Sequence, residues 1–150
     1  MQRRKVKFNS LFEALEDARH LQSAGYEQVG NWNLEQIVDH LVKTFPITVK
    51  QANFGIPRFV RPVLKWLFFG KMRRGEWLSM KATAPPQLVP DDNIELEEKL
   101  KEFEHWAKLL ESDETEFVPL HPVFGKINRE EWLIMQRWHA AHHLSFLVPK

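Results

Sequence analysis

The 150-residue sequence contains no cysteine, which excludes disulfides, thiolate nucleophiles and cysteine-ligated zinc sites. It has one tyrosine beside eleven phenylalanines and six tryptophans, so we do not expect a tyrosine general acid. No apolar run approaches the ~18 to 20 residues that span a membrane, and the basic N-terminus lacks the apolar core of a secretion signal. We therefore expect a cytoplasmic protein in which His, Asp or Glu would hold any metal.

An excess of charge of either sign is also missing. The net charge is +1, from 21 basic and 20 acidic residues, which argues against a nucleic acid partner. A hydrophobic share of 43% with 27% charged residues is typical of a globular protein. The length suits one domain over residues 1–150 that buries a sizeable core.

Helix start signals recur along the chain as capping boxes, in which a small polar residue is followed three positions later by Glu or Gln. They occur at Ser10 with Glu13, Asn33 with Gln36, Asp92 with Glu95, and Asn128 with Glu131. Apolar spacing after these signals predicts helices over about Leu11–Ala24, from Leu34 with a kink at Pro46, Ile94–Leu110 and Arg129–Leu147. No alternating strand pattern stands out, so we predict an all-α fold, most simply a four-helix bundle.

The second and third helices are separated by about forty residues, Phe54 to Pro90, which is too long for a plain bundle loop. We expect a short extra helix near Pro57–Phe69, with Pro57 in its first turn and Pro62 distorting its interior. An extended crossover follows from Gly70 to Pro90. Such a crossover lets the second and third helices run parallel.

Residues 54–90 form a basic aromatic segment with one acid, Glu76. Its basic residues are Arg58, Arg61, Lys65, Lys71, Arg73, Arg74 and Lys81, and its interleaved aromatic residues are Phe59, Trp66, Phe68, Phe69 and Trp77. This composition could serve a membrane surface or a nucleic acid. We favour a lid whose aromatic side chains pack on the bundle while its charges meet solvent. Those charges could also neutralise the eleven acids of residues 91–116, within or between subunits.

Two imidazoles, His139 and His143, stand four residues apart in the predicted last helix. At about 100° per residue both point along the apolar stripe that carries Trp132 and Met135, so they should face the core. A buried imidazole must satisfy both ring nitrogens, and a pair at this spacing is typical of a metal chelate. His142 projects to one side of the pair and should support the site from there or meet solvent.

A metal site needs a third ligand. His40 is the first candidate, because it lies at the border of the second helix's apolar stripe, where it can face a neighbouring helix. His121 is the second candidate; it lies in a turn-rich loop before the last helix and could instead order that loop. His20 and His105 lie among charged residues and should be solvated.

Three stretches, Trp32 to Leu41, His121 to Gly125 and Trp138 to His143, resemble the DinB/YfiT-like superfamily of metalloenzymes, and most closely an uncharacterised branch of it. The resemblance covers nearly the whole chain in helix order. It implies a four-helix bundle with an up-down-down-up course, which holds a divalent metal with one histidine of the second helix and two residues of the last. By position these ligands are His40, His139 and His143. Characterised relatives include thiol-dependent S-transferases and isomerases, which implies a low-molecular-weight thiol as cosubstrate.

Three neutral imidazoles leave a divalent ion with its full charge and open positions, which suits lowering the pKa of a thiol or a water. We therefore predict attack on a small electrophilic substrate by a thiol S-transferase or a hydrolase. Zn²⁺ is the first choice, with Ni, Fe or Mn as alternatives. His142, His121 and Asp39 are candidates for proton handling or ligand support.

A second hypothesis is a non-enzymatic helical bundle that binds a protein or a membrane surface through the basic aromatic segment. In either case, the acidic third helix and the basic segment would suit a homodimer through a self-complementary surface.

Overall fold

The computed structural model describes residues 2–78 and 82–150. Within these residues the protein is mostly helical, with two small antiparallel sheets. The α-helices are α1 (Leu11–Ala24), α2 (Leu34–Thr44), α3 (Arg61–Arg73), α4 (Leu96–Glu111) and α5 (Arg129–Leu144). The short 3₁₀ helices are η1 (Phe45–Thr48) and η2 (Pro86–Leu88), and the strands are β1 (Tyr26–Gln28), β2 (Leu120–His121), β3 (Gly125–Lys126) and β4 (Leu147–Pro149).

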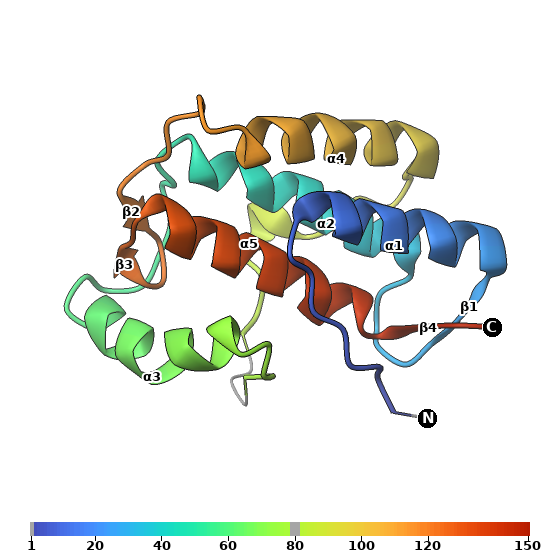
Figure 1. Ribbon diagram of the computed structural model, residues 1–150, viewed down its shortest axis with the longest axis horizontal. Coiled ribbons are helices and arrows are strands. Elements are labelled where there is room, and N and C mark those ends of the chain that lie inside the picture. Colours follow the sequence, from blue (N-terminus) through green and yellow to red (C-terminus); the bar gives the residue numbers. More distant parts are fainter. Residues whose placement is uncertain (1, 79–81) are drawn as a thin grey trace.

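Four of the helices, α1, α2, α4 and α5, pack against one another. α2 packs on α4, and α1 packs on both α4 and α5. Figure 1 shows α1 and α5 running in one direction while α2 and α4 run in the other. α2 and α4 therefore lie parallel, joined by the long segment that contains α3. None of the described helices is long and apolar enough to cross a membrane.

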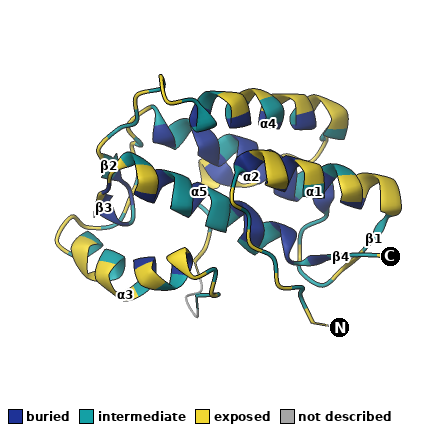
Figure 2. Cartoon of the chain, viewed as in Figure 1, coloured by how far each residue is buried: buried dark blue, intermediate teal, exposed yellow. Residues whose placement is uncertain are grey.

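Two apolar clusters hold the helices together. The larger one lies between α1, α2, α4 and the second half of α5, where Phe45 meets Phe103 edge to face at 4.9 Å between ring centroids. Figure 2 shows the buried residues on the sides of these helices that face one another. The smaller cluster joins one face of α3 to the β2–β3 turn and the first half of α5, through Phe69, Phe124 and Trp132.

Three of the four predicted helix caps form. Ser10, Asn33 and Asn128 each accept a hydrogen bond from the backbone N–H three residues on, which satisfies a free donor at the start of α1, α2 and α5. The predicted cap at Asp92 is wrong, because α4 begins at Leu96 without a side-chain cap. Contacts between Asp91 and α2 hold the preceding residues against that helix instead.

The two prolines that were expected to distort helix interiors lie elsewhere. Pro46 does not kink a continuing helix, because α2 ends at Thr44 and Pro46 lies in the 3₁₀ helix η1. Pro62 occupies the first turn of α3, where its missing N–H costs nothing. α3 thus begins at Arg61 and continues to Arg73, later at both ends than predicted. Lys81, one of the basic residues of the segment 54–90, lies outside the described part of the chain.

The expectation that no strands form is wrong. α5 ends at Leu144, short of the predicted Leu147, and the next residues pair as β4 with β1, aligning Leu147 with Gln28 and Pro149 with Tyr26. A hairpin of β2 and β3 aligns His121 with Gly125, whose φ of 72° suits glycine. Strands of two or three residues are too short to show an alternating pattern.

Candidate metal centre

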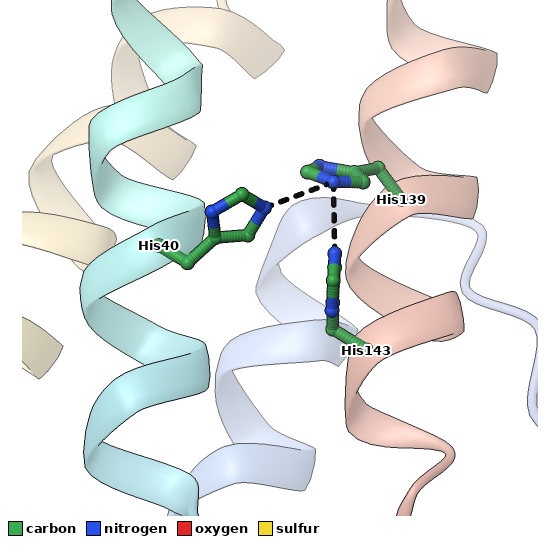
Figure 3. Close-up of side chains that lie close together, drawn as sticks. All are labelled: His40, His139 and His143. Atoms are coloured by element: carbon green, nitrogen blue, oxygen red, sulfur yellow. Dashed lines mark hydrogen bonds between the residues drawn. The ribbon is translucent and has the colours of Figure 1, made fainter. Parts of the chain in front are cut away.

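Three histidines from two helices converge on one point. His40 projects from α2, and His139 and His143 project from successive turns of α5, as Figure 3 shows. The Nε2 atom of His139 lies 3.3 Å from Nε2 of His40 and 3.0 Å from Nε2 of His143. Among the described residues these three form the one group of this kind that could hold a metal ion, with ligand atoms all within 4.8 Å of one another.

The spacing of the nitrogens fits a shared ion. Two imidazole nitrogens at about 2.0 to 2.1 Å from a tetrahedral Zn²⁺ lie roughly 3.3 Å apart. The two measured separations, 3.3 and 3.0 Å, are close to that value. The helices therefore already hold His139 at the separation from each of the other two rings that a common ion requires.

The tautomer of His40 is set by a backbone carbonyl. Nδ1 of His40 donates to the carbonyl oxygen of Leu88, in η2, over 2.7 Å. A neutral imidazole that donates from Nδ1 has its free lone pair on Nε2, the atom that faces His139. This is the arrangement by which proteins orient a metal-binding histidine.

The rings of this group are held neutral by their surroundings. Burial, and then the neighbouring imidazoles, lower the pKa of His139 and His143 well below the usual value. Burial also lowers the pKa of His40 and outweighs the Leu88 carbonyl, which acts to raise it. Trp32 covers the group, with its ring 4.9 Å from that of His40 and stacked 5.4 Å from that of His143. The site therefore offers three neutral nitrogen donors beneath an aromatic wall.

Asp39 secures the segment that carries Leu88. Its fully buried carboxylate lies 3.0 Å from Lys43 Nζ and 3.3 Å from Lys99 Nζ, and it accepts the backbone N–H of Asp91. Burial acts to raise the pKa of Asp39, but the Asp91 hydrogen bond and the two ammonium groups hold it below its usual value. Lys43 also donates to the carbonyl oxygen of Val89. Asp39 thus ties α2 to α4 and to the residues that follow η2.

His142 lies beside the three-histidine group. Its ring stacks on Trp138 at 5.2 Å and lies 5.0 Å from the ring of His143. Nδ1 of His142 faces the guanidinium of Arg3 at 3.4 Å. Burial, and then the charge of Arg3, lower the pKa of His142 to about 4, so the ring is neutral at pH 7.

His121 is engaged in the turn between β2 and β3. Its Nδ1 accepts the backbone N–H groups of Val123 and Phe124, at 3.0 and 3.2 Å, and its ring stacks on Phe124. Burial, and then the charge of Arg61, lower its pKa to about 3. The structure thus brings His40, and not His121, to the α5 pair, while His20 and His105 are exposed as expected.

Sequence reasoning missed two contributors to the site, Leu88 and Trp32. Leu88 acts through its carbonyl group, which every residue has, so no side-chain signal could have identified it. Trp32 directly precedes the Asn33 capping residue, so the start of α2 sets its place beside His40. An aromatic residue just before a helix that carries a candidate ligand is the signal that could have found it.

The fold and the site define a mostly helical protein with three histidines that could bind a divalent metal. The chain belongs to the family described as "Protein of unknown function (DUF1569)", which matches it over residues 1–150. No curated protein and no solved structure matches the chain. Any statement about its chemistry therefore rests on the three-histidine group itself.

Proposed function

We propose that the protein is a metal-dependent enzyme in which His40, His139 and His143 bind one divalent ion. The observation that carries this proposal is the convergence of three Nε2 atoms at 3.0 and 3.3 Å. Hydrogen bonding alone explains the group poorly. A neutral imidazole has one N–H, and His40 uses its own on the Leu88 carbonyl, so its Nε2 can only accept. If Nε2 of His139 donates to it, the same atom cannot also accept from His143, so hydrogen bonds leave one of the two contacts unexplained.

The proposed reaction is attack by a thiol or a water on a small electrophilic substrate, as in a thiol S-transferase or a hydrolase. A divalent ion on three neutral imidazoles supplies the full double charge that lowers the pKa of a thiol or water. Zn²⁺ is the proposed ion by ligand type, with Ni, Fe or Mn as alternatives. The resemblance to thiol-dependent S-transferases supports a low-molecular-weight thiol as cosubstrate, and the chain has no cysteine that could take its place.

The chain's own residues would orient the reactants. Trp32 presents an aromatic face beside His40 and His143, which suits a small, partly hydrophobic substrate. Of the candidates for proton handling, His142 lies nearest the group and is neutral at pH 7. Asp39 pairs with Lys43 and Lys99, and His121 accepts hydrogen bonds within the β2–β3 turn. We therefore propose that these two residues position other parts of the site and do not transfer protons.

The wider relationship is part of the same proposal. The opposed directions of α1 and α5 against α2 and α4 support a four-helix, up-down-down-up bundle of the DinB/YfiT type. The resemblance of the histidine-bearing stretches to that superfamily supports it as well. We also propose that the protein forms a homodimer.

The test is metal content, measured by elemental mass spectrometry on protein purified without a histidine tag or chelator. We expect one transition metal ion per chain in the natural protein and none in a His40→Ala, His139→Ala, His143→Ala variant. A His20→Ala, His105→Ala variant is the matched control, because it removes two exposed imidazoles and should keep the metal. Circular dichroism establishes that each variant is folded.

The single variant His139→Ala keeps the test decisive if the triple variant does not fold, because His139 is the residue that approaches both other ligands. It should lower the affinity for added Zn²⁺ strongly. Absence of metal from the natural protein, even after incubation with zinc, nickel or manganese, would overturn the proposal. Metal that survives in the folded triple variant would place the ion elsewhere.

A further inference from the structure

α3 has two apolar faces, and the rest of the protein covers one of them. Phe69 and Met72 are buried in the smaller cluster, where Phe69 meets Phe124 edge to face at 5.7 Å. This face packs the helix against α5 and the β2–β3 hairpin. The prediction of a lid whose aromatic residues pack on the bundle is right for this face.

The opposite face of α3 carries a stripe of exposed apolar side chains, and here the lid prediction is wrong. Phe59, in the turn that leads into the helix, and Trp66 are each 82% exposed, and Val63 and Leu67 are 52% and 47% exposed. Their spacing places all four along one side of the helix. The other large apolar side chains that are exposed in the described residues, Phe12 and Val89, lie apart.

Basic groups surround this stripe. Residues 54–78 contain six basic side chains and one acid, Glu76. Arg58 and Lys71 form no ion pair with a described residue, and Arg73 and Arg74 pair only with the exposed side chains of Glu130 and Glu76. Such exposed pairs are worth little, so the four cations are available to an external anion. The predicted neutralisation by residues 91–116 does not occur within the described chain, because no ion pair joins the two segments.

The position of α3 leaves the stripe open. Figure 1 shows the helix at an edge of the molecule, away from α1, α2 and α4. Figure 2 shows exposed residues along its outer side. A shallow hollow of about 380 Å³ beside Trp66 is bordered by Lys65, Arg73 and Glu131, and Lys65 pairs with Glu131 there.

A second copy of the chain is a poor match for this surface. Two stripes that met face to face would bring their basic residues together, and like charges at close range oppose association. The exposed side of α4 would supply acids, but it offers no large apolar side chain to cover Trp66 and Phe59. Its exposed residues are Glu97, Glu98, Lys101, Glu102, His105 and Lys108. The surface therefore suits a partner with an apolar region that takes up the exposed stripe and anionic groups that meet the basic side chains around it.

We infer that α3 docks the protein on an anionic lipid surface, with Phe59, Val63, Trp66 and Leu67 entering the interface while Arg58, Lys71, Arg73 and Arg74 meet lipid phosphates. A lipid bilayer combines both requirements, since acyl chains lie directly under a charged headgroup layer. Tryptophan favours this boundary. The helix lies on the surface and does not cross it, consistent with its thirteen residues.

The experiment is co-sedimentation of the full chain with phosphatidylcholine vesicles that contain phosphatidylserine, compared with phosphatidylcholine alone. We expect binding to the anionic vesicles that weakens as salt rises. Phe59→Ser with Trp66→Ser should lower the partition at least about tenfold. Arg58→Gln and Lys71→Gln should lower it about fivefold each. Phe12→Ser, on α1, is the control and should bind as the natural chain does.

All substituted side chains except Phe12 lie on the segment outside the three-histidine group, so metal content and thermal unfolding should stay as in the natural protein. Equal binding by the Phe59→Ser, Trp66→Ser variant, or no binding at low salt by the natural chain, would overturn the inference. A dimer in sedimentation that this variant disperses, together with no vesicle binding, would overturn it in favour of an interface between copies.

Discussion

α5 and α3 depart from the ordinary amphipathic helix in opposite directions. α5 turns the imidazoles of His139 and His143 toward α2, where His40 meets them. α3 turns Phe59, at its start, and Trp66 toward solvent, where no described residue covers them. The polar side chains of α5 thus contact a third histidine of the same chain, whereas the exposed apolar side chains at α3 contact no described residue that covers them. Polar side chains that converge inside a protein indicate a binding site formed by the chain itself. Apolar side chains that remain exposed together indicate a surface that binds another molecule.

The largest expected effect is a loss of stability in the α5 region as the pH falls. Five histidines have lowered pKa values, and burial is the main cause for each of them. They are His40, His121, His139, His142 and His143. In the unfolded chain each imidazole titrates near pH 6.5, so protons bind the unfolded state first as pH falls. The stabilisation is complete above that pH and is lost below it. For metal-free protein we expect the free energy of unfolding to drop between pH 7 and pH 5, by about 2 kcal/mol for each of His121 and His142, whose folded pKa values of about 3 and about 4 lie below this range.

Urea denaturation at a series of pH values measures this effect. His139→Leu removes one of these imidazoles and should make the dependence shallower. The matched change on α3, Phe59→Ser with Trp66→Ser, should leave it unaltered, because that face contains no histidine. A free energy of unfolding that stayed constant from pH 7 to pH 5 would contradict the buried, neutral state of these rings.

The two faces of α3 should respond very differently to truncation. Phe69→Ala opens a cavity in the smaller cluster and should cost about 3 to 4 kcal/mol of stability. Trp66→Ala, on the exposed face of the same helix, should cost less than about 0.5 kcal/mol. Both values come from urea denaturation at pH 7. Comparable losses for the two variants would mean that the outer face is covered in solution.

The last of the expected effects concerns the buried carboxylate of Asp39, which precedes His40 in α2. Asp39→Asn removes the charge that Lys43 and Lys99 face and should cost roughly 2 kcal/mol, less than a fully buried pair because the lysines are partly exposed. It should also loosen the segment that carries the Leu88 carbonyl and weaken Zn²⁺ binding by about tenfold in calorimetric titration. Glu104→Gln, in an exposed pair with Lys108, is the matched control and should change neither quantity appreciably. Unaltered zinc affinity in Asp39→Asn would mean that the contacts of Asp39 with Lys43, Lys99 and Asp91 do not support the metal centre.

Local signals explain what could be predicted from the sequence. Capping residues such as Asn33 and Asn128 act on backbone groups three positions away, so the starts of α2 and α5 are readable from short stretches. The spacing of His139 and His143 is equally local. The resemblance, together with the border position of His40, brought the third histidine into the group. The structure brings the Nε2 atoms of these three residues together.

The parts that escaped prediction depend on distant contacts. β4 forms only because β1 lies alongside it, and neither strand has a pattern of its own. α3 is apolar on two sides, with Trp66 and Phe69 on different faces, so periodicity could not say which face the protein covers. The cap at Asp92 failed for a similar reason, because Asp91 is held by Asp39 and Lys43 of α2.

The pairing of β4 with β1 also orders events during synthesis. The strand that anchors the end of α5 aligns with residues that precede α2, and 99 positions separate His40 from His139. Such distant contacts form late, because closing a long loop costs entropy before any contact is gained. A chain leaving the ribosome therefore exposes His40 well before its two partners have been made. An ion shared by the three histidines could therefore be bound only after α5 has been synthesised.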